Sequence, residues 1–169
     1  VTDDIPSVSL ALTPSSADIM EEKPRKNKSI LNKALVRWLV LAAITMTTFT
    51  LFSFFLSSTI LKEDIVHART IALVTLILLE IAGSYNFMSF RRLIKPSSLR
   101  ANKPLFYTAI ISIAATLVII YTNLNKMFGT TPLTSLEWLI PILFAFLFIL
   151  IFNIMKYFNN KSHFWDFNE

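Results

Sequence analysis

The chain has 169 residues, of which 54% are hydrophobic, and it contains no cysteine. Its mean hydropathy of +0.58 is far too high for a soluble domain of 19.3 kDa. The formal net charge of +5 does not indicate a nucleic-acid partner, because the basic residues cluster between apolar runs and form no continuous stripe. The missing cysteines exclude disulfides and thiolate metal sites. Composition therefore predicts an integral membrane protein whose main partner is the lipid bilayer.

Residues 1–12 are a short, mostly apolar piece interrupted by Asp3, Asp4 and Pro6. The stretch lacks the layout of a signal peptide, and the chain opens on Val1. We interpret this beginning as either a cut from a longer protein or a GTG start codon that was read literally. Residues 13–37 follow as a hydrophilic connector that contains Pro14 and Pro24.

Four long apolar runs come next, and about 20 helical residues cross the roughly 30 Å hydrocarbon core of a bilayer. The expected fold is an all-α membrane protein: a bundle of four full transmembrane helices plus the cytoplasmic half of a preceding one, in residues 1–12. The third apolar run continues to Asn125. The predicted membrane helices are residues 38–61, 70–90, 104–122 and 138–155, and a polar tail covers 156–169.

The distribution of Lys and Arg predicts the orientation of these helices. One side, formed by residues 13–37, the loop 91–103 and the tail, carries 13 of them, and the other side carries 3. By the positive-inside rule, the richer side faces the cytoplasm. We therefore expect a multi-pass protein of the cell membrane with a cytoplasmic C-terminus.

Glu80 lies near the middle of the second run, where an acidic side chain costs about 2.5–3.5 kcal/mol to insert. It should face the bundle interior and serve in ion or proton binding. The alternative is a protonated carboxyl that donates a hydrogen bond to another helix. Gly83 and Ser84 share its helical face, and Gly83 would let a second helix approach closely.

A second group of candidate ligands precedes Pro6. Thr2, Asp3 and Asp4 offer hydroxyl and carboxylate oxygens, and the proline frees carbonyl oxygens beside them. Such oxygens suit hard cations, and broken membrane helices build cation sites in this way. The plainer interpretation is a set of polar residues at a frayed terminus.

Other polar residues favour structural roles. Asn86 could bind an ion or bridge helices, and we favour bridging. His67 and His163 look isolated and solvated, in a loop and in the tail. Thr134 and Glu137 form a capping box that predicts a helix start before the fourth run.

Several of these motifs, taken in order, resemble the P-type cation-transporting ATPases, in particular the branch of the calcium and sodium pumps. The similarity covers nearly the whole chain and would make the four spans helices seven to ten of such a pump. The motifs are Thr2-Asp3-x-x-Pro6 with Leu10-Ala11-Leu12, Asp18-Ile19-Met20-x-x-x-Pro24-Arg25, Ala68-Arg69-Thr70-Ile71-Ala72 leading to Glu80 and Asn86, and Phe128-Gly129-Thr130-Thr131-Pro132-Leu133 with Trp138.

The resemblance implies roles for particular residues. Thr2 and Asp3 match the sixth-helix motif that binds the transported cation, and Glu80 matches the eighth-helix acidic ligand of the sarcoplasmic-reticulum calcium pump. Asp4 and Asn86 are further candidates whose roles stay open. The implied cation is Ca²⁺ or another hard cation.

The resemblance also implies a larger parent that uses ATP and Mg²⁺ and is phosphorylated on an aspartate. The expected partner is the N-terminal remainder of the pump, with transport helices 1–6 and the cytoplasmic domains. This segment is expected to bind no cofactor itself and to hydrolyse no ATP alone. The alternative is a stand-alone four-span protein, acting as an assembly partner, a pump remnant or a proton-coupled carrier that uses Glu80.

Overall fold

The computed structural model describes residues 33–88 and 102–162, and within them every regular element is helical. Four helices are long and apolar enough to cross a membrane, which confirms the predicted all-α fold. The half-helix predicted for residues 1–12 lies outside the described residues. The elements are α2 (Lys33–Phe55), the π-helix η2 (Leu56–Ile60) that continues it, α3 (Ile65–Phe87), α5 (Lys103–Tyr121), the short α6 (Asn125–Phe128) and α7 (Leu139–Ser162).

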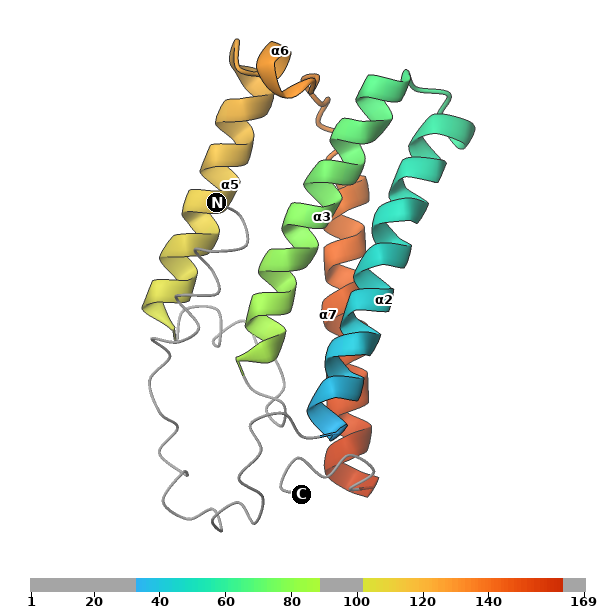
Figure 1. Cartoon of the computed structure of the whole chain (residues 1–169), viewed down its shortest axis with the longest axis vertical. Helices are drawn as coiled ribbons and strands as arrows, with labels where there is room; N and C mark the ends of the chain where they lie inside the picture. The colour runs from blue at the N-terminus through green and yellow to red at the C-terminus, as the bar shows by residue number, and fades with distance from the viewer. Residues whose placement is uncertain (1–32, 89–101, 163–169) are drawn as a thin grey trace.

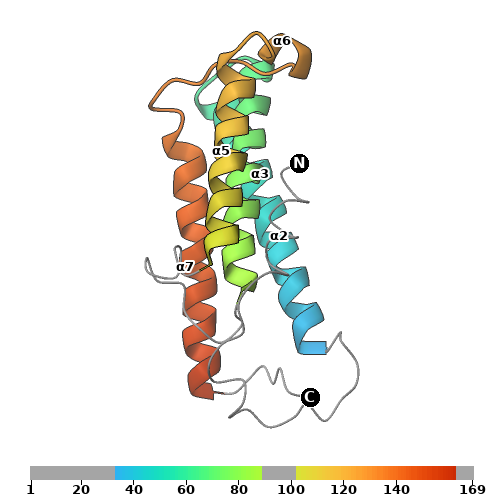
Figure 2. The ribbon, with the colours of Figure 1, turned by 90° about the vertical axis from the view of Figure 1, so that its left-hand side faces the viewer.

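The four long helices run side by side along one axis, with α3 in the middle (Figure 1). Helix α3 contacts α2, α5 and α7, and α2 also contacts α7. After a quarter turn, α5 lies over α3, with α7 and α2 to either side (Figure 2). The turn from η2 to α3 and the segment around α6 lie at the same end of the bundle (Figure 1). Polar groups from these two connections can therefore meet there.

The largest core cluster joins α2, α3 and α7. Trp38 from α2 packs edge-on against Phe152 from α7, with ring centroids 5.2 Å apart, and the tilted ring of Phe148 packs against Phe152 at 4.6 Å. Ala42 and Ala82 are buried in the same cluster. These small residues let the helix backbones approach closely enough for the aromatic rings to interlock, as membrane helices require.

Many large apolar side chains point outward over the length of the bundle. Leu51 of α2 is 63% exposed, Ile111 of α5 is 52% exposed and Phe146 of α7 is 60% exposed. Patches of this kind are unusual on a soluble monomer, but in a bilayer they face lipid tails or neighbouring helices. The exposed faces therefore agree with a membrane-embedded protein.

Local signals explain where the helices begin. Asn102 caps α5, because its side-chain oxygen accepts a hydrogen bond from the Leu105 amide at 3.3 Å, and Pro104 sits in the first turn. Before α7, the carboxylate of Glu137 accepts a hydrogen bond from the Thr134 amide at 2.6 Å. That contact is one half of the predicted capping box.

Candidate cation site

Glu80 lies on the partly covered face of α3, which we define as Leu73, Leu76, Glu80 and Ser84. These positions follow one side of the helix, and Leu73 is exposed while the other three are half-buried. The neighbouring Leu79, Ala82 and Gly83 are buried. The Oε2 atom of Glu80 is itself buried, so the described helices already cover part of this carboxylate.

The residues expected beside Glu80 have distinct roles. The Ser84 hydroxyl donates to the backbone carbonyl of Glu80 at 3.0 Å, so this hydrogen bond satisfies the serine within its own helix. Gly83 is buried against α2, where an added methyl group would collide with the Met46 side chain. Close approach of another helix at Gly83 is confirmed, and the approaching helix is α2.

Asn86 connects α3 to α7 through its backbone. The Nζ atom of Lys156 donates to the Asn86 carbonyl oxygen at 2.8 Å, and both residues are fully buried. Asn86 lies in the last turn of α3, whose carbonyls lack partners within the helix, so the Lys156 ammonium caps that end. The side-chain amide of Asn86 has no hydrogen-bond partner within residues 33–88 and 102–162.

The position of Lys156 in the structure differs from the position expected from the sequence. The polar tail was predicted to begin at this residue, but α7 continues to Ser162 and buries Lys156 against α3. A lysine just after an apolar run normally extends toward the membrane surface. Here the free carbonyl at the end of α3 gives the ammonium a closer partner. Sequence alone offered no sign of this contact.

The other predicted ligands, Thr2, Asp3 and Asp4, lie outside the described residues, as does His163. Of the candidate cation ligands, the structure therefore places only Glu80 and Asn86. Glu80 and Asn86 do not share a face of α3. They are six residues apart, and at about 100° per residue their side chains point in directions roughly 120° apart around the helix. Asn86 also lies beside the Lys156 ammonium, which would repel a bound cation.

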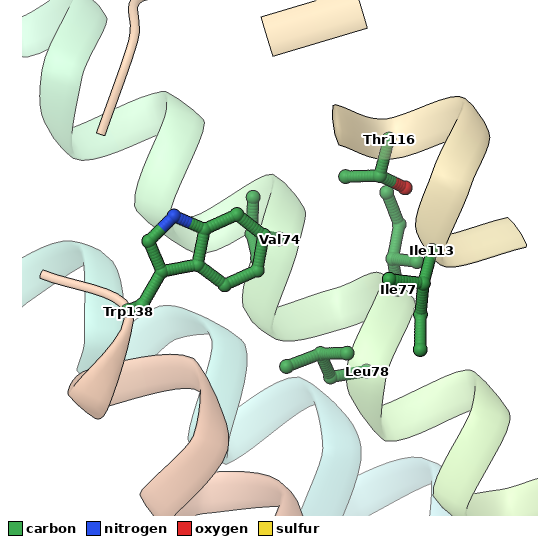
Figure 3. A pocket seen from close by; sticks show the side chains of 6 residues that line it. All are labelled: Val74, Ile77, Leu78, Ile113, Thr116 and Trp138. Carbon is green, nitrogen blue, oxygen red and sulfur yellow. The ribbon is translucent and has the colours of Figure 1, made fainter. Parts of the chain in front are cut away.

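Two threonine hydroxyls of α2 and the crevice beside α3 have structural explanations. Thr45 and Thr48 donate to the carbonyls of Leu41 and Ile44 at 2.7 and 2.8 Å. The crevice has room for about one water molecule and an apolar lining, so it suits no hydrated cation. Figure 3 shows its lining: Val74, Ile77 and Leu78 from α3, Ile113 and Thr116 from α5, and Trp138 before α7.

The expectation for His67 was wrong, because this residue is neither isolated nor in a loop. It lies in the first turn of α3, where Nδ1 is 3.1 Å from the Thr131 hydroxyl and Nε2 is 3.0 Å from Glu137 Oε1. Burial raises the pKa of Glu137, but the polar contacts from His67 and Thr134 more than offset this and hold that pKa below its usual range. Partners so distant in sequence could not be read from the chain.

Comparisons with known proteins agree with these features. A family model described as the C-terminus of cation transporting ATPases matches residues 1–158. A protein of Bacillus cereus called calcium-transporting ATPase 1 is 26% identical over 172 aligned residues. That alignment covers 92% of this chain but 19% of the relative, so the chain spans about a fifth of that protein's length.

Proposed function

This chain belongs to the family of cation-transporting ATPase C-termini, and on that premise we propose that it supplies part of an intramembrane cation site to an ATP-driven pump. The proposal gives Glu80 the role of a direct cation ligand, together with Thr2 and Asp3. It gives the four long helices the second role of supporting the transport helices of the pump. Its expected partner is therefore the remaining part of the pump.

The position of Glu80 carries the proposal. The residue lies seven positions before the end of α3 at Phe87, or about 10 Å along the helix axis. A carboxylate at this depth is unfavourable in lipid unless a protein partner or an ion compensates it. On the partly covered face of α3, the Glu80 side chain is half-buried and its Oε2 atom is buried. The transport helices of the pump would complete the surroundings of this carboxylate.

The number of oxygen ligands that Ca²⁺ requires explains why other helices must contribute to the site. A Ca²⁺ ion binds about six to eight oxygen atoms in proteins, and one glutamate offers at most two. Thr2 and Asp3 would add hydroxyl and carboxylate oxygens from the preceding helix, and the rest must come from outside this chain. The name of the Bacillus relative favours Ca²⁺ as the transported cation. We assign Asn86 to the α3–α7 contact and not to the cation site.

ATP and Mg²⁺ would act in the remainder of the pump. Phosphoryl transfer needs an acceptor carboxylate and ligands for Mg²⁺ and phosphate in an ordered aqueous domain. The long helices of the described residues are membrane-spanning in length and composition, so the contribution of this segment would be to cation affinity. A defect in this segment should therefore change the cation dependence of phosphorylation.

Glu80→Gln in the complete pump tests the assignment. The substitution keeps the size of the side chain and removes its charge, so a ligand role predicts about tenfold or greater loss of apparent Ca²⁺ affinity. The measurement is the Ca²⁺ dependence of phosphorylation by ATP. Ser84→Ala is the matched control, because it alters the same helix face and removes only a hydroxyl that binds backbone.

The proposal would fail if Glu80→Gln left the Ca²⁺ dependence unchanged while the protein reached the membrane in normal amounts. Glu80 would then be a structural hydrogen-bonding group. Competition with Mg²⁺, Mn²⁺ and Na⁺ in the same assay would identify the preferred cation. Equal loss of affinity in Ser84→Ala would point to a general disturbance of α3 and would also contradict the ligand role.

A further inference from the structure

A second cluster of ionisable side chains lies at the opposite end of α3. Glu63, His67 and Glu137 each direct a ligand atom into one small region, and these atoms all lie within 4.8 Å of one another. Glu63 comes from the turn after η2, and Glu137 comes from the segment before α7. His67 is 13 residues from Glu80, or about 20 Å along α3, so this cluster is separate from the proposed transport site.

The Nδ1 atom of His67 fixes the orientation of the imidazole ring. Nδ1 lies 3.1 Å from the Thr131 hydroxyl oxygen, and the Thr131 amide in turn donates to Thr70 Oγ1 at 3.0 Å. When Nδ1–H donates to Thr131, Nε2 carries a lone pair. A histidine whose second nitrogen is fixed in this way is the usual form of a metal-binding histidine.

The contact between His67 and Glu137 is short but poorly aligned for a hydrogen bond. Nε2 is 3.0 Å from Glu137 Oε1, yet it is buried and makes no hydrogen bond of acceptable geometry to any described residue. A lone pair and a carboxylate oxygen at this separation repel each other unless a proton or a metal ion lies between them. Neighbouring ligands of one metal ion, each at about 2.1 Å from it, stand roughly 3.0–3.4 Å apart.

The Glu63 side chain has no other structural role among the described residues. Its side chain forms no hydrogen bond or ion pair there, and it is half-buried near the carboxylate of Glu137. Its backbone is held in place, because the Glu63 amide donates to the Ser57 carbonyl at 3.1 Å and Lys62 adopts a left-handed φ of 56°. Two carboxylates kept close together are unfavourable without a compensating positive charge.

We propose that Glu63, His67 and Glu137 bind one divalent ion of the Zn²⁺ class, which links the turn before α3 to the segment before α7. One imidazole and two carboxylates, completed by water, match the sites that proteins use for Zn²⁺. The imidazole ligand argues against Ca²⁺ and Mg²⁺, which bind oxygen atoms. The bound ion would hold α3 and α7 in register at this end of the bundle.

The test is Zn²⁺ binding to the intact protein that carries this segment, measured by calorimetry in detergent. Glu63→Gln is the decisive variant, because it removes a proposed ligand without breaking any hydrogen bond or ion pair seen in the structure. Asp64→Asn is the matched control, because it removes an exposed carboxylate from the same turn. We expect tight binding of Zn²⁺ to the wild type and to Asp64→Asn, and at least a tenfold weaker affinity in Glu63→Gln.

Two further measurements address the histidine. Thr131→Val keeps all three ligands but frees the ring, so it should weaken Zn²⁺ binding by about 10–100-fold. Zinc K-edge absorption should show one imidazole in the wild type, and this signal should disappear in His67→Asn. If His67→Asn fails to fold, Glu63→Gln and Thr131→Val still decide the question.

A simple ion pair between His67 and Glu137 makes the opposite predictions. Glu63→Gln and Asp64→Asn would then bind Zn²⁺ equally, and Thr131→Val would leave the affinity unchanged. Either result would overturn the proposal. Displacement of the bound Zn²⁺ by Ca²⁺ at similar concentration would also overturn it, because the site would then lack the imidazole ligand that distinguishes the two ions.

Discussion

Gly83 shows how a single residue sets the spacing of two membrane helices. It is buried where α3 meets α2, and the Met46 side chain occupies the space that a larger residue would need. Met46 and Phe49 also border the core cluster around Trp38. The absence of a side chain at Gly83 therefore positions α3, and with it the depth and direction of Glu80.

Gly83→Leu should destabilise the protein by about 1–3 kcal/mol, the usual effect of adding bulk to a packed core. Thermal unfolding in detergent, followed by circular dichroism, would measure the loss. The added Met46→Ala substitution should restore part of it, because the two sites are in contact. Ala114→Leu on α5 is the control, since Ala114 is exposed and tolerates added volume. Equal loss in both leucine variants would contradict this account.

At the scale of helices, the contact between α3 and α7 relies on Lys156. Its ammonium caps the carbonyl of Asn86, while its stem fills space between the two helices. Lys156→Ala removes both functions and should lower the free energy of unfolding by about 2 kcal/mol or more. Lys156→Met keeps the stem and should cost less, because burying an ammonium is itself unfavourable.

Chemical unfolding of the two variants in detergent would rank them. The control is Lys103→Ala, since Lys103 is exposed at the start of α5 and its loss should change stability by only about 0.5 kcal/mol. A Lys156→Ala variant as stable as this control would show that the buried contact contributes nothing to the α3–α7 packing.

The helices could be predicted from the sequence, but the contacts between them could not. Apolar runs of about 20 residues identify spans directly, because the bilayer fixes the length needed. In the first turns of α3, His67 and Arg69 interrupt the apolar residues, so the predicted start at residue 70 is later than the observed start at Ile65. His67 meets Thr131, 64 positions later, only after both connections reach the same end of the bundle. Contacts over such distances follow from packing.

At the scale of the whole molecule, the directions of the helices determine which connections meet. The four long helices alternate in direction, so the turn before α3 and the segment around α6 lie together at one end (Figure 1). The ends of α3 and α7 that contain Asn86 and Lys156 lie at the other. The proposed Zn²⁺ site and the Lys156 contact therefore fasten opposite ends of the same bundle, with Glu80 between them.

Orientation in the membrane decides which compartment each end faces. The charge bias of 13 basic residues against 3 predicts that the tail is cytoplasmic and that α6 is outside. This segment has no cysteine, so single cysteines can be placed in it once any others in the intact protein are replaced. Met127→Cys suits the outer end, because Met127 is 81% exposed in α6, and Asn168→Cys marks the tail.

An impermeant thiol reagent applied to intact cells should label Met127→Cys and leave Asn168→Cys unlabelled. Both positions should react after the cells are broken, which controls for accessibility. The physical reason is the cost of moving clustered Lys and Arg across the membrane during insertion. The reverse pattern would place the Glu63, His67 and Glu137 cluster in the cytoplasm, where free Zn²⁺ is buffered to very low levels. Labelling of Met127→Cys in intact cells would instead place the proposed zinc site on the external side. External Zn²⁺ could then reach the site without crossing the membrane.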